Sequence, residues 1–132
     1  MANELPEGSY PAIASVVTLT KSTTKGTPEV RIGFGIVAGA QDGRGAFWDG
    51  WLTEGAWKHT EKALKILGWS GQSLSSVSRD CTGQKAEIVV KHEVDEETGR
   101  VSARVAFVNR FVEPLADSES AALDRQFVRR GR

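Results

Sequence analysis

The feature that most constrains this 132-residue chain is the order of its strand-like and helical segments. Apolar side chains alternate with other residues in three early segments, at residues 10–20, 29–38 and 46–52, as is typical of half-buried strands. A helical pattern follows at residues 53–67, and two more alternating segments lie at residues 86–91 and 101–108. This order predicts one mostly β domain whose helix joins the third strand to the fourth.

The order is typical of a five-stranded Greek-key barrel of the oligonucleotide-binding (OB) type, which binds ligands over its second and third strands and their flanking loops. We therefore expect an all-β fold with one helix between strands 3 and 4. We place this domain at residues 1–112 and assign residues 113–132 to a C-terminal tail. The tail is expected to contain a short helix, because apolar and basic residues have helical spacing in it: Leu123, Arg125, Phe127, Arg129 and Arg130.

The helical segment at residues 53–67 has recognisable ends. Thr53 is expected to be the N-cap, because a threonine oxygen can accept a hydrogen bond from the first helical turn. Gly68 suits the C′ position, and Trp69 after it can complete a Schellman motif with Leu64. The buried stripe is expected to be Ala56, Trp57, Thr60, Ala63, Leu64 and Leu67. We assign Trp57 and Trp69 to structure, and residues 70–78 to a serine-rich connector.

The alternation also predicts which strand faces are buried. In the second strand the inward residues are Val30, Ile32, Phe34, Ile36 and Ala38, and in the fifth they are Val101, Ala103, Val105 and Phe107. In the first strand apolar residues occur on both faces, so both are expected to be partly buried. Gly33 and Gly35 lie on the outward face of the second strand, where a bend and the close approach of a ligand both remain open.

The composition fits one globular domain, with 39% hydrophobic and 26% charged residues. No apolar run approaches the length of a membrane span, and residues 1–8 lack the pattern of a signal peptide. The single cysteine, Cys81, excludes an internal disulfide and is expected to be a small buried residue. The formal net charge is zero, so a surface for nucleic acid would require local clustering of positive charge.

Little in the sequence indicates catalysis. His59 and His92 lack HExxH spacing, and each is expected at the surface or rim of the domain. Asp80 beside Cys81 disfavours a thiolate. The acidic run at residues 95–97 lacks the ligand spacing of a calcium loop and is typical of a hairpin tip. We therefore expect no enzymatic activity, no cofactor and no bound metal.

The aromatic and basic residues indicate a ligand surface more strongly. Trp48 and Trp51 lie on opposite faces of the third strand, so at least one is expected to point out of the barrel. An outward tryptophan can stack on a base or pack against a partner protein, and nearby basic residues can contact phosphates. The predicted nucleic-acid-binding residues are Lys21, Lys25, Arg31, Arg44, Trp48, Trp51, Lys91, Arg104 and Arg110.

Several segments resemble a family of small bacteriophage proteins. The similar segments are GSY (8–10), KG (25–26), FWDGWLTEGA (47–56), LKILGWSG (64–71), CTGQKAEIVVKHE (81–93) and RVAFVNRF (104–111). The resemblance spans about residues 7–112, and the family comprises phage single-stranded DNA-binding proteins and related phage domains of unknown function.

The resemblance implies an OB-fold protein that coats single-stranded DNA, without sequence preference, during phage replication, recombination or repair in the cytoplasm of the infected bacterium. It also implies contacts with phage or host replication and recombination proteins, and it leaves a homodimer open. Such proteins often end in an acidic tail, whereas residues 129–132 are basic. The acidic run at 95–97 should repel phosphates and direct DNA over the second and third strands.

Two other functions remain open at this point. The same barrel can serve as a protein-interaction or virion-associated module that does not bind nucleic acid, with one of the two tryptophans of the third strand covered by a partner. It can also inhibit a host enzyme. Fold class alone does not distinguish these functions from DNA binding.

Overall fold

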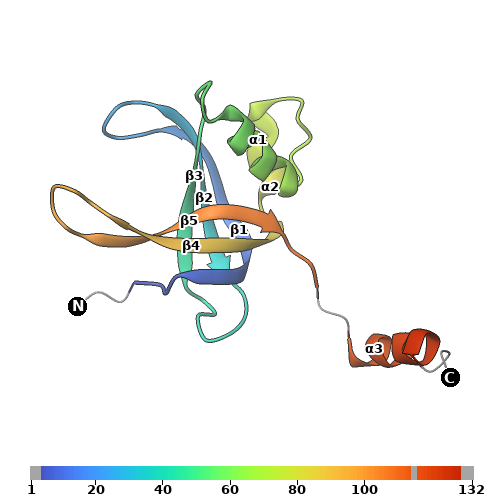
Figure 1. Cartoon of the computed structure of the whole chain (residues 1–132). Coiled ribbons are helices and arrows are strands. Elements are labelled where there is room, and N and C mark those ends of the chain that lie inside the picture. The colour runs from blue at the N-terminus through green and yellow to red at the C-terminus, as the bar shows by residue number, and fades with distance from the viewer. Residues whose placement is uncertain (1–3, 114–115, 129–132) are drawn as a thin grey trace.

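The computed structural model describes residues 4–113 and 116–128. A five-stranded antiparallel sheet with the strand order β3-β2-β1-β4-β5 forms its centre (Figure 1). The strands are β1 (Gly8–Lys21), β2 (Pro28–Ile36), β3 (Gly45–Trp51), β4 (Lys85–Val94) and β5 (Val101–Arg110). The prediction of a mostly β fold with five strands is confirmed, and the sheet is consistent with an OB-like fold.

The sheet bends so that its two end strands approach each other. β3 and β5 stand at opposite ends of the strand order but pack side by side. Asp49 of β3 forms an ion pair with Arg104 of β5 at 2.5 Å. The long strand β1 serves both halves of the sheet, because residues 8–13 pair with β4 and residues 12–21 pair with β2.

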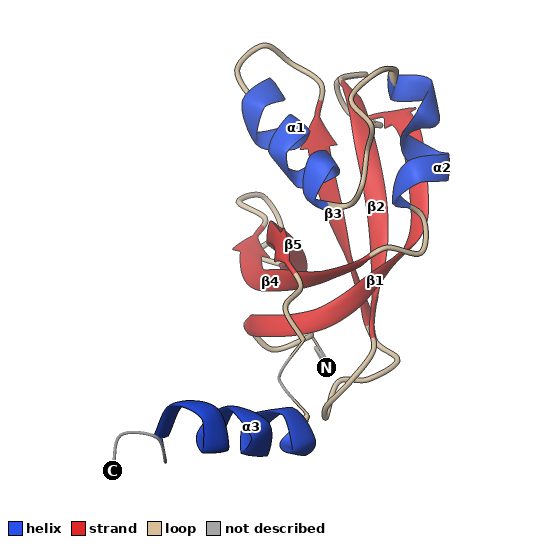
Figure 2. Cartoon of the chain, turned by 90° about the vertical axis from the view of Figure 1, so that its right-hand side faces the viewer, coloured by secondary structure: helices blue, strands red, loops and turns tan. Residues whose placement is uncertain are grey.

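The helices between β3 and β4 lie at one end of the sheet (Figure 2). They are α1 (Trp57–Ile66), the short 3-10 turn η1 (Leu74–Ser76) and α2 (Val77–Cys81). α1 packs against β3 and β5, and α2 packs against β1. The sequence predicted only a connector, at residues 70–78, where η1 and the first two residues of α2 lie. Asp80 holds this region together, because its carboxylate accepts hydrogen bonds from the Ser70 N–H and the Ser76 hydroxyl.

The end of α1 agrees with the sequence, but its start does not. Thr53 was predicted to be the N-cap, whereas the helix begins at Trp57 and Ala56 precedes it without a side-chain cap. Thr53 instead closes a turn in which its hydroxyl oxygen accepts from the Ala56 N–H at 3.3 Å. At the other end Gly68 has a φ of 92°, and the Trp69 N–H donates to the Leu64 carbonyl at 3.0 Å, which completes the predicted Schellman motif.

Two β-bulges change which residues of β1 and β5 face the core. Between Ala14 and Val16 the register of β1 against β2 shifts, so Val17 is buried while Val16 is exposed. Between β4 and β5 the register shifts at Val89 and Val90. The predicted inward position of Phe107 is therefore wrong, since Phe107 is exposed and its neighbour Val108 is buried. A bulge inserts one residue and reverses the alternation beyond it.

The hydrophobic core lies between the sheet and the α1–α2 segment. It includes the inward side chains of β2, which are Val30, Ile32, Phe34 and Ile36. Leu64, Leu67 and Trp69 contribute from α1 and its C-terminal end. Cys81 is fully buried, as predicted, and its burial raises the pKa of the thiol to about 11. A thiol with this pKa stays protonated near neutral pH and is a poor nucleophile.

Gly50 of β3 is required by the packing of Trp48. A Cβ atom at this position would lie 2.4 Å from the Trp48 ring and 2.9 Å from Thr60 Cγ2. Gly50→Ala is therefore expected to lower the free energy of unfolding by about 1–3 kcal/mol through overpacking. Urea unfolding followed by circular dichroism measures this loss. Gly55→Ala is the matched control, since a Cβ there meets nothing within 4 Å, and an equal loss in both variants would contradict the explanation.

The C-terminal tail contains the helix α3 (Asp117–Leu123), which continues into the π-helical turn η2 (Asp124–Val128). Both views show α3 apart from the sheet (Figures 1 and 2). The side chains of α3 and η2 are exposed, including Leu123 of α3 and Phe127 of η2. Arg129 and Arg130, which the sequence placed on this helix, lie outside the described residues.

Candidate nucleic-acid interface

The outward faces of β1, β2 and β3 form three rows of neighbouring side chains. The register aligns Val16 with Gly33 and Phe47, then Thr18 with Arg31 and Asp49, and finally Thr20 with Glu29 and Trp51. Alternate residues of one strand share a face, so β3 presents Phe47, Asp49 and Trp51 together. An aromatic, an acidic and a second aromatic side chain therefore follow one another along this strand.

Phe47 is an exposed aromatic residue that lies across Gly33. Its ring is so close that a Cβ atom at Gly33 would lie 3.1 Å from Phe47 Cε1. The Arg31 guanidinium carbon lies 4.2 Å from the ring centroid, which is cation–π geometry. Neither of the two explanations left open for Gly33, a bend and the close approach of a ligand, is shown by this contact, in which the glycine makes room for the Phe47 ring.

The two tryptophans of β3 have different environments. Trp51 is 36% exposed and points outward, whereas Trp48 is only 6% exposed and belongs to the hydrophobic core. The prediction that Trp48 contacts nucleic acid is therefore wrong. Its side of the strand faces α1, which supplies the buried residues Thr60, Ala63 and Leu64. Only Trp51 of this pair can offer a ring face to a ligand without unfolding the core.

Two adjoining hollows lie along this outward face, and we call them together the groove. One has a volume of about 620 Å³ and is partly lined by residues of the β1–β2 loop. The other has a volume of about 440 Å³ and extends toward β4. Both are lined by Asp49, Trp51 and Arg104. The first hollow is also lined by Thr20, Lys21, Ser22, Thr23, Thr24, Glu29 and Arg31. The second is also lined by Phe47, Lys91, His92, Glu93, Val105 and Ala106.

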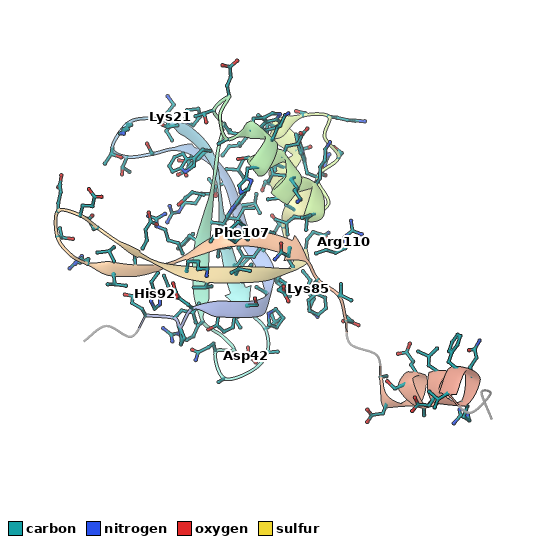
Figure 3. All side chains as sticks on the ribbon, in the orientation of Figure 1. Lys21, Asp42, Lys85, His92, Phe107 and Arg110 are labelled. Carbon is teal, nitrogen blue, oxygen red and sulfur yellow. The ribbon has the colours of Figure 1, made fainter. Side chains whose placement is uncertain are left out.

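Two projecting hairpins border the groove. The β1–β2 and β4–β5 hairpins extend on the same side of the sheet (Figure 1). Figure 3 shows Lys21 near the first hairpin and His92 near the second. A ligand that follows the groove therefore passes between two flanking loops, as OB-type ligands do.

Asp49 is the electrostatic centre of the groove. Its side chain is only 7% exposed, and its Oδ1 atom pairs with Arg31 Nη1 at 3.0 Å while Oδ2 pairs with Arg104 Nη1. Glu93 of β4 forms an ion pair with Arg104 as well, with 2.8 Å between Glu93 Oε2 and Arg104 Nε. These contacts fix two guanidinium groups from β2 and β5 on either side of one carboxylate. Both arginines remain partly exposed and keep further N–H donors for a ligand.

Glu29 is the second buried acid of the groove. It is 4% exposed and lies opposite Trp51 in the β2–β3 register. Its Oε2 atom is buried and receives no hydrogen bond from the residues that the structure describes. Burial raises the pKa of the Glu29 carboxyl, and the neighbouring Asp49 carboxyl raises it further. The positive charges of Arg31 and Arg104 lower this pKa, but their effects are smaller. Two neighbouring carboxyl groups disfavour ionising together.

The structure places most, but not all, of the predicted residues along the groove. Lys21, Arg31, Trp51, Lys91 and Arg104 line it. Arg44 lies beside it, in a neighbouring hollow that Phe47 also lines, and donates to the Gln41 side-chain oxygen at 2.9 Å. Lys25 lies in the β1–β2 loop without lining the groove.

Arg110 is the predicted residue that lies farthest from the groove. It ends β5 near Lys85, at the opposite end of the sheet from the projecting hairpins (Figure 3). Arg104 and Arg110 are on the same strand but do not share a surface, because Arg104 lies opposite Lys91 and Arg110 lies six residues further along β5, opposite Ala86. We therefore remove Arg110 from the proposed interface.

The predicted binding residues do not include Glu29, Phe47 and Asp49, although all three line the groove. The signal for Phe47 was present, because it shares a strand face with Trp51 and must point outward when Trp51 does. No comparable signal marks the two acids. Their alternation predicts a solvent-facing position, and their burial depends on Trp51, the arginines and the β1–β2 loop.

The acidic β4–β5 turn is organised by its own backbone. Asp95 Oδ1 accepts hydrogen bonds from the N–H groups of Glu97 and Thr98 at 2.8 and 3.1 Å. Both bonds lower the pKa of Asp95, and the bond from Thr98 has the larger effect. Asp95 therefore stays ionised near neutral pH, and its negative charge disfavours phosphates at this tip.

The two histidines have structural contacts. His92 Nε2 lies 2.8 Å from the Leu5 carbonyl oxygen, and the His92 backbone N–H donates to Glu7 at 2.7 Å. His59 packs edge-on against Phe107. Among residues 4–113 and 116–128, no group of three or more metal-binding side chains is placed to hold a metal ion. No helix within these ranges is long and apolar enough to cross a membrane.

Comparison with known proteins gives little further information. No protein-family model and no curated protein matches the chain. Among solved structures, a chain of yeast RPA bound to ssDNA is similar at a TM-score of 0.42 and 8% sequence identity, over 98% of this chain and 89% of that chain. A likeness of this size carries no argument about fold or function. Both therefore rest on the residues of the chain itself.

Proposed function

We propose that the protein binds single-stranded DNA, without sequence preference, in the groove across β2, β3 and β5. The observation that carries this proposal is the outward pair Phe47 and Trp51, set beside Arg31, Arg104 and Lys21. Aromatic rings stack on bases of any identity, and basic side chains pair with the phosphates between them. A single strand exposes both groups at once, whereas a duplex hides the base faces.

We further propose that the sheet closes between β3 and β5 as an OB barrel, with α1 covering one end. The side-by-side packing of β3 and β5 and the Asp49–Arg104 ion pair support closure. In this proposal residues 1–112 form the DNA-binding domain and residues 113–132 the tail. The position of the groove between the β1–β2 and β4–β5 hairpins is the one expected for ligands of this fold.

The sequence resemblance extends the proposal to a biological role. It favours a bacteriophage protein that protects single strands during replication, recombination or repair in the host cytoplasm. Contacts with phage or host replication and recombination proteins, and a homodimer, belong to the same proposal. The exposed apolar residues of α3 and η2 offer one surface for such a partner.

The salt dependence of binding tests the phosphate contacts. Affinity for oligo(dT) is expected to fall as salt rises, because bound lysines and arginines release counterions. Lys21→Ala should reduce the slope of log affinity against log salt by about 1. Fluorescence anisotropy at several salt concentrations measures it. Arg110→Ala removes a charge at the far end of β5 and should leave the slope unchanged. Equal binding of single-stranded and duplex DNA at low salt would contradict the proposed function and favour a protein-interaction module.

A further inference from the structure

The buried carboxyl pair of the groove has a role that stacking and phosphate contacts do not explain. Both oxygens of Asp49 are occupied, one by Arg31 and one by Arg104. Glu29 is 4% exposed and lines the same hollow as Asp49, Arg31 and Arg104, and its burial raises the pKa of its carboxyl. Two ionised carboxylates are both acceptors, so a hydrogen bond between them requires a proton. The Oε2 atom of Glu29 is buried and has no hydrogen-bond donor among the described residues. A negative charge on this carboxyl would therefore be costly.

We infer that Glu29 is a positioning residue and that it carries a proton in the DNA-binding state. The protonated Glu29 keeps Asp49 between Arg31 and Arg104, so that both guanidinium groups are available to a phosphate. This inference rests on the proposed function. With its proton, Glu29 is neutral and donates to Asp49, and the groove contains one negative charge fewer. Without it, the added charge repels the phosphate and competes with Asp49 for the two arginines.

The sign of the effect follows from linkage. A bound phosphate is negative, so it raises the pKa of Glu29 above its value in the DNA-free protein. Between the pKa of the free protein and that of the DNA-bound protein, binding therefore takes up a proton. Affinity must then fall as pH rises through this range. The loss is about tenfold for each unit by which bound DNA raises the pKa of Glu29. Above the pKa of the bound state the affinity levels off.

Other charged groups face the same space and must be separated from Glu29. Arg31 (β2), Arg104 (β5) and Lys21 (β1) line the same hollow as Glu29, and Lys91 (β4) lines the adjoining one. Glu93 is exposed and paired with Arg104. His92 lines the hollow toward β4. The test therefore needs a variant of Glu93 and a variant of His92.

The test measures oligo(dT) affinity from about pH 5 to about pH 8 at constant low salt, a range in which histidine and a raised carboxyl can titrate. The wild type should bind most tightly at the acidic end. Glu29→Gln keeps a donor toward Asp49 but has no proton to lose, so it should keep the acidic-end affinity across the range. Glu93→Gln and His92→Gln should both retain the slope of the wild type. Circular dichroism checks that each variant is folded.

An NMR titration of the Glu29 side-chain carboxyl carbon in the DNA-free protein provides a second readout. It should show a midpoint above that of the exposed Glu96. A midpoint equal to that of Glu96 overturns the inference, as does a pH slope that survives in Glu29→Gln or disappears in His92→Gln. These failures leave single-stranded DNA binding intact. Absence of oligo(dT) binding at every pH instead overturns the proposed function, and the inference with it.

Discussion

Trp48→Ala is expected to lower the free energy of unfolding by about 3–5 kcal/mol, the usual cost of removing a buried large aromatic side chain. The ring fills the space between β3 and α1, and Gly50 is packed directly against it. The loss is a large fraction of the 5–15 kcal/mol or so that a small domain has in total. Urea unfolding followed by circular dichroism measures it, and a substantial unfolded population at room temperature is a natural outcome.

Trp51→Ala on the same strand is the control for this prediction. Its ring is already partly in water, so its removal should cost markedly less stability than that of Trp48. The contrast separates the core face of β3 from its ligand face, which the sequence left open. Equal destabilisation by the two changes would contradict the assignment of Trp48 alone to the core.

The strands of this fold could be predicted where their side chains alternate regularly, as they do in β2. In β2 the inward residues Val30, Ile32, Phe34 and Ile36 are all buried as expected, whereas Ala38, also predicted to face inward, lies beyond the end of β2 and is exposed. The bulges in β1 and β5 could not be predicted in this way. An inserted residue is invisible in the alternation of one strand, since it exists only relative to the partner strand. The misplacement of Phe107 follows from that limit.

The candidate site was predictable to a similar degree. Alternation shows that Trp48 and Trp51 point in opposite directions, but the helix that covers one face decides which of them is outward. The carboxyl pair of Glu29 and Asp49 is a tertiary feature. The environment of this pair depends on the packing of β5 against β3, which brings Arg104 to Asp49. That contact between distant segments could not be predicted from local sequence. The helical start at Trp57 was missed because Thr53 uses its hydroxyl in a separate turn.

Removing both outward aromatic side chains is expected to have the largest effect on DNA binding. Phe47 and Trp51 are four residues apart on β3, a separation of about 13 Å along a strand, so each can stack on a different base. Each stacked base contributes about 1–3 kcal/mol. Sites this far apart usually contribute additively.

The double change Phe47→Ala and Trp51→Ala should therefore weaken binding of oligo(dT) by at least about 30-fold, the lower end of the combined stacking energies. Each single change should account for part of the loss, and anisotropy titrations at fixed salt measure all three variants. Phe107→Ala is the matched control, because Phe107 is exposed to the same degree as Phe47, at 49% against 48%, but lies outside the groove. Its affinity should equal that of the wild type. If the double variant remained folded and bound single strands as tightly as the wild type, stacking in this groove would be wrong, whatever the arginines contribute.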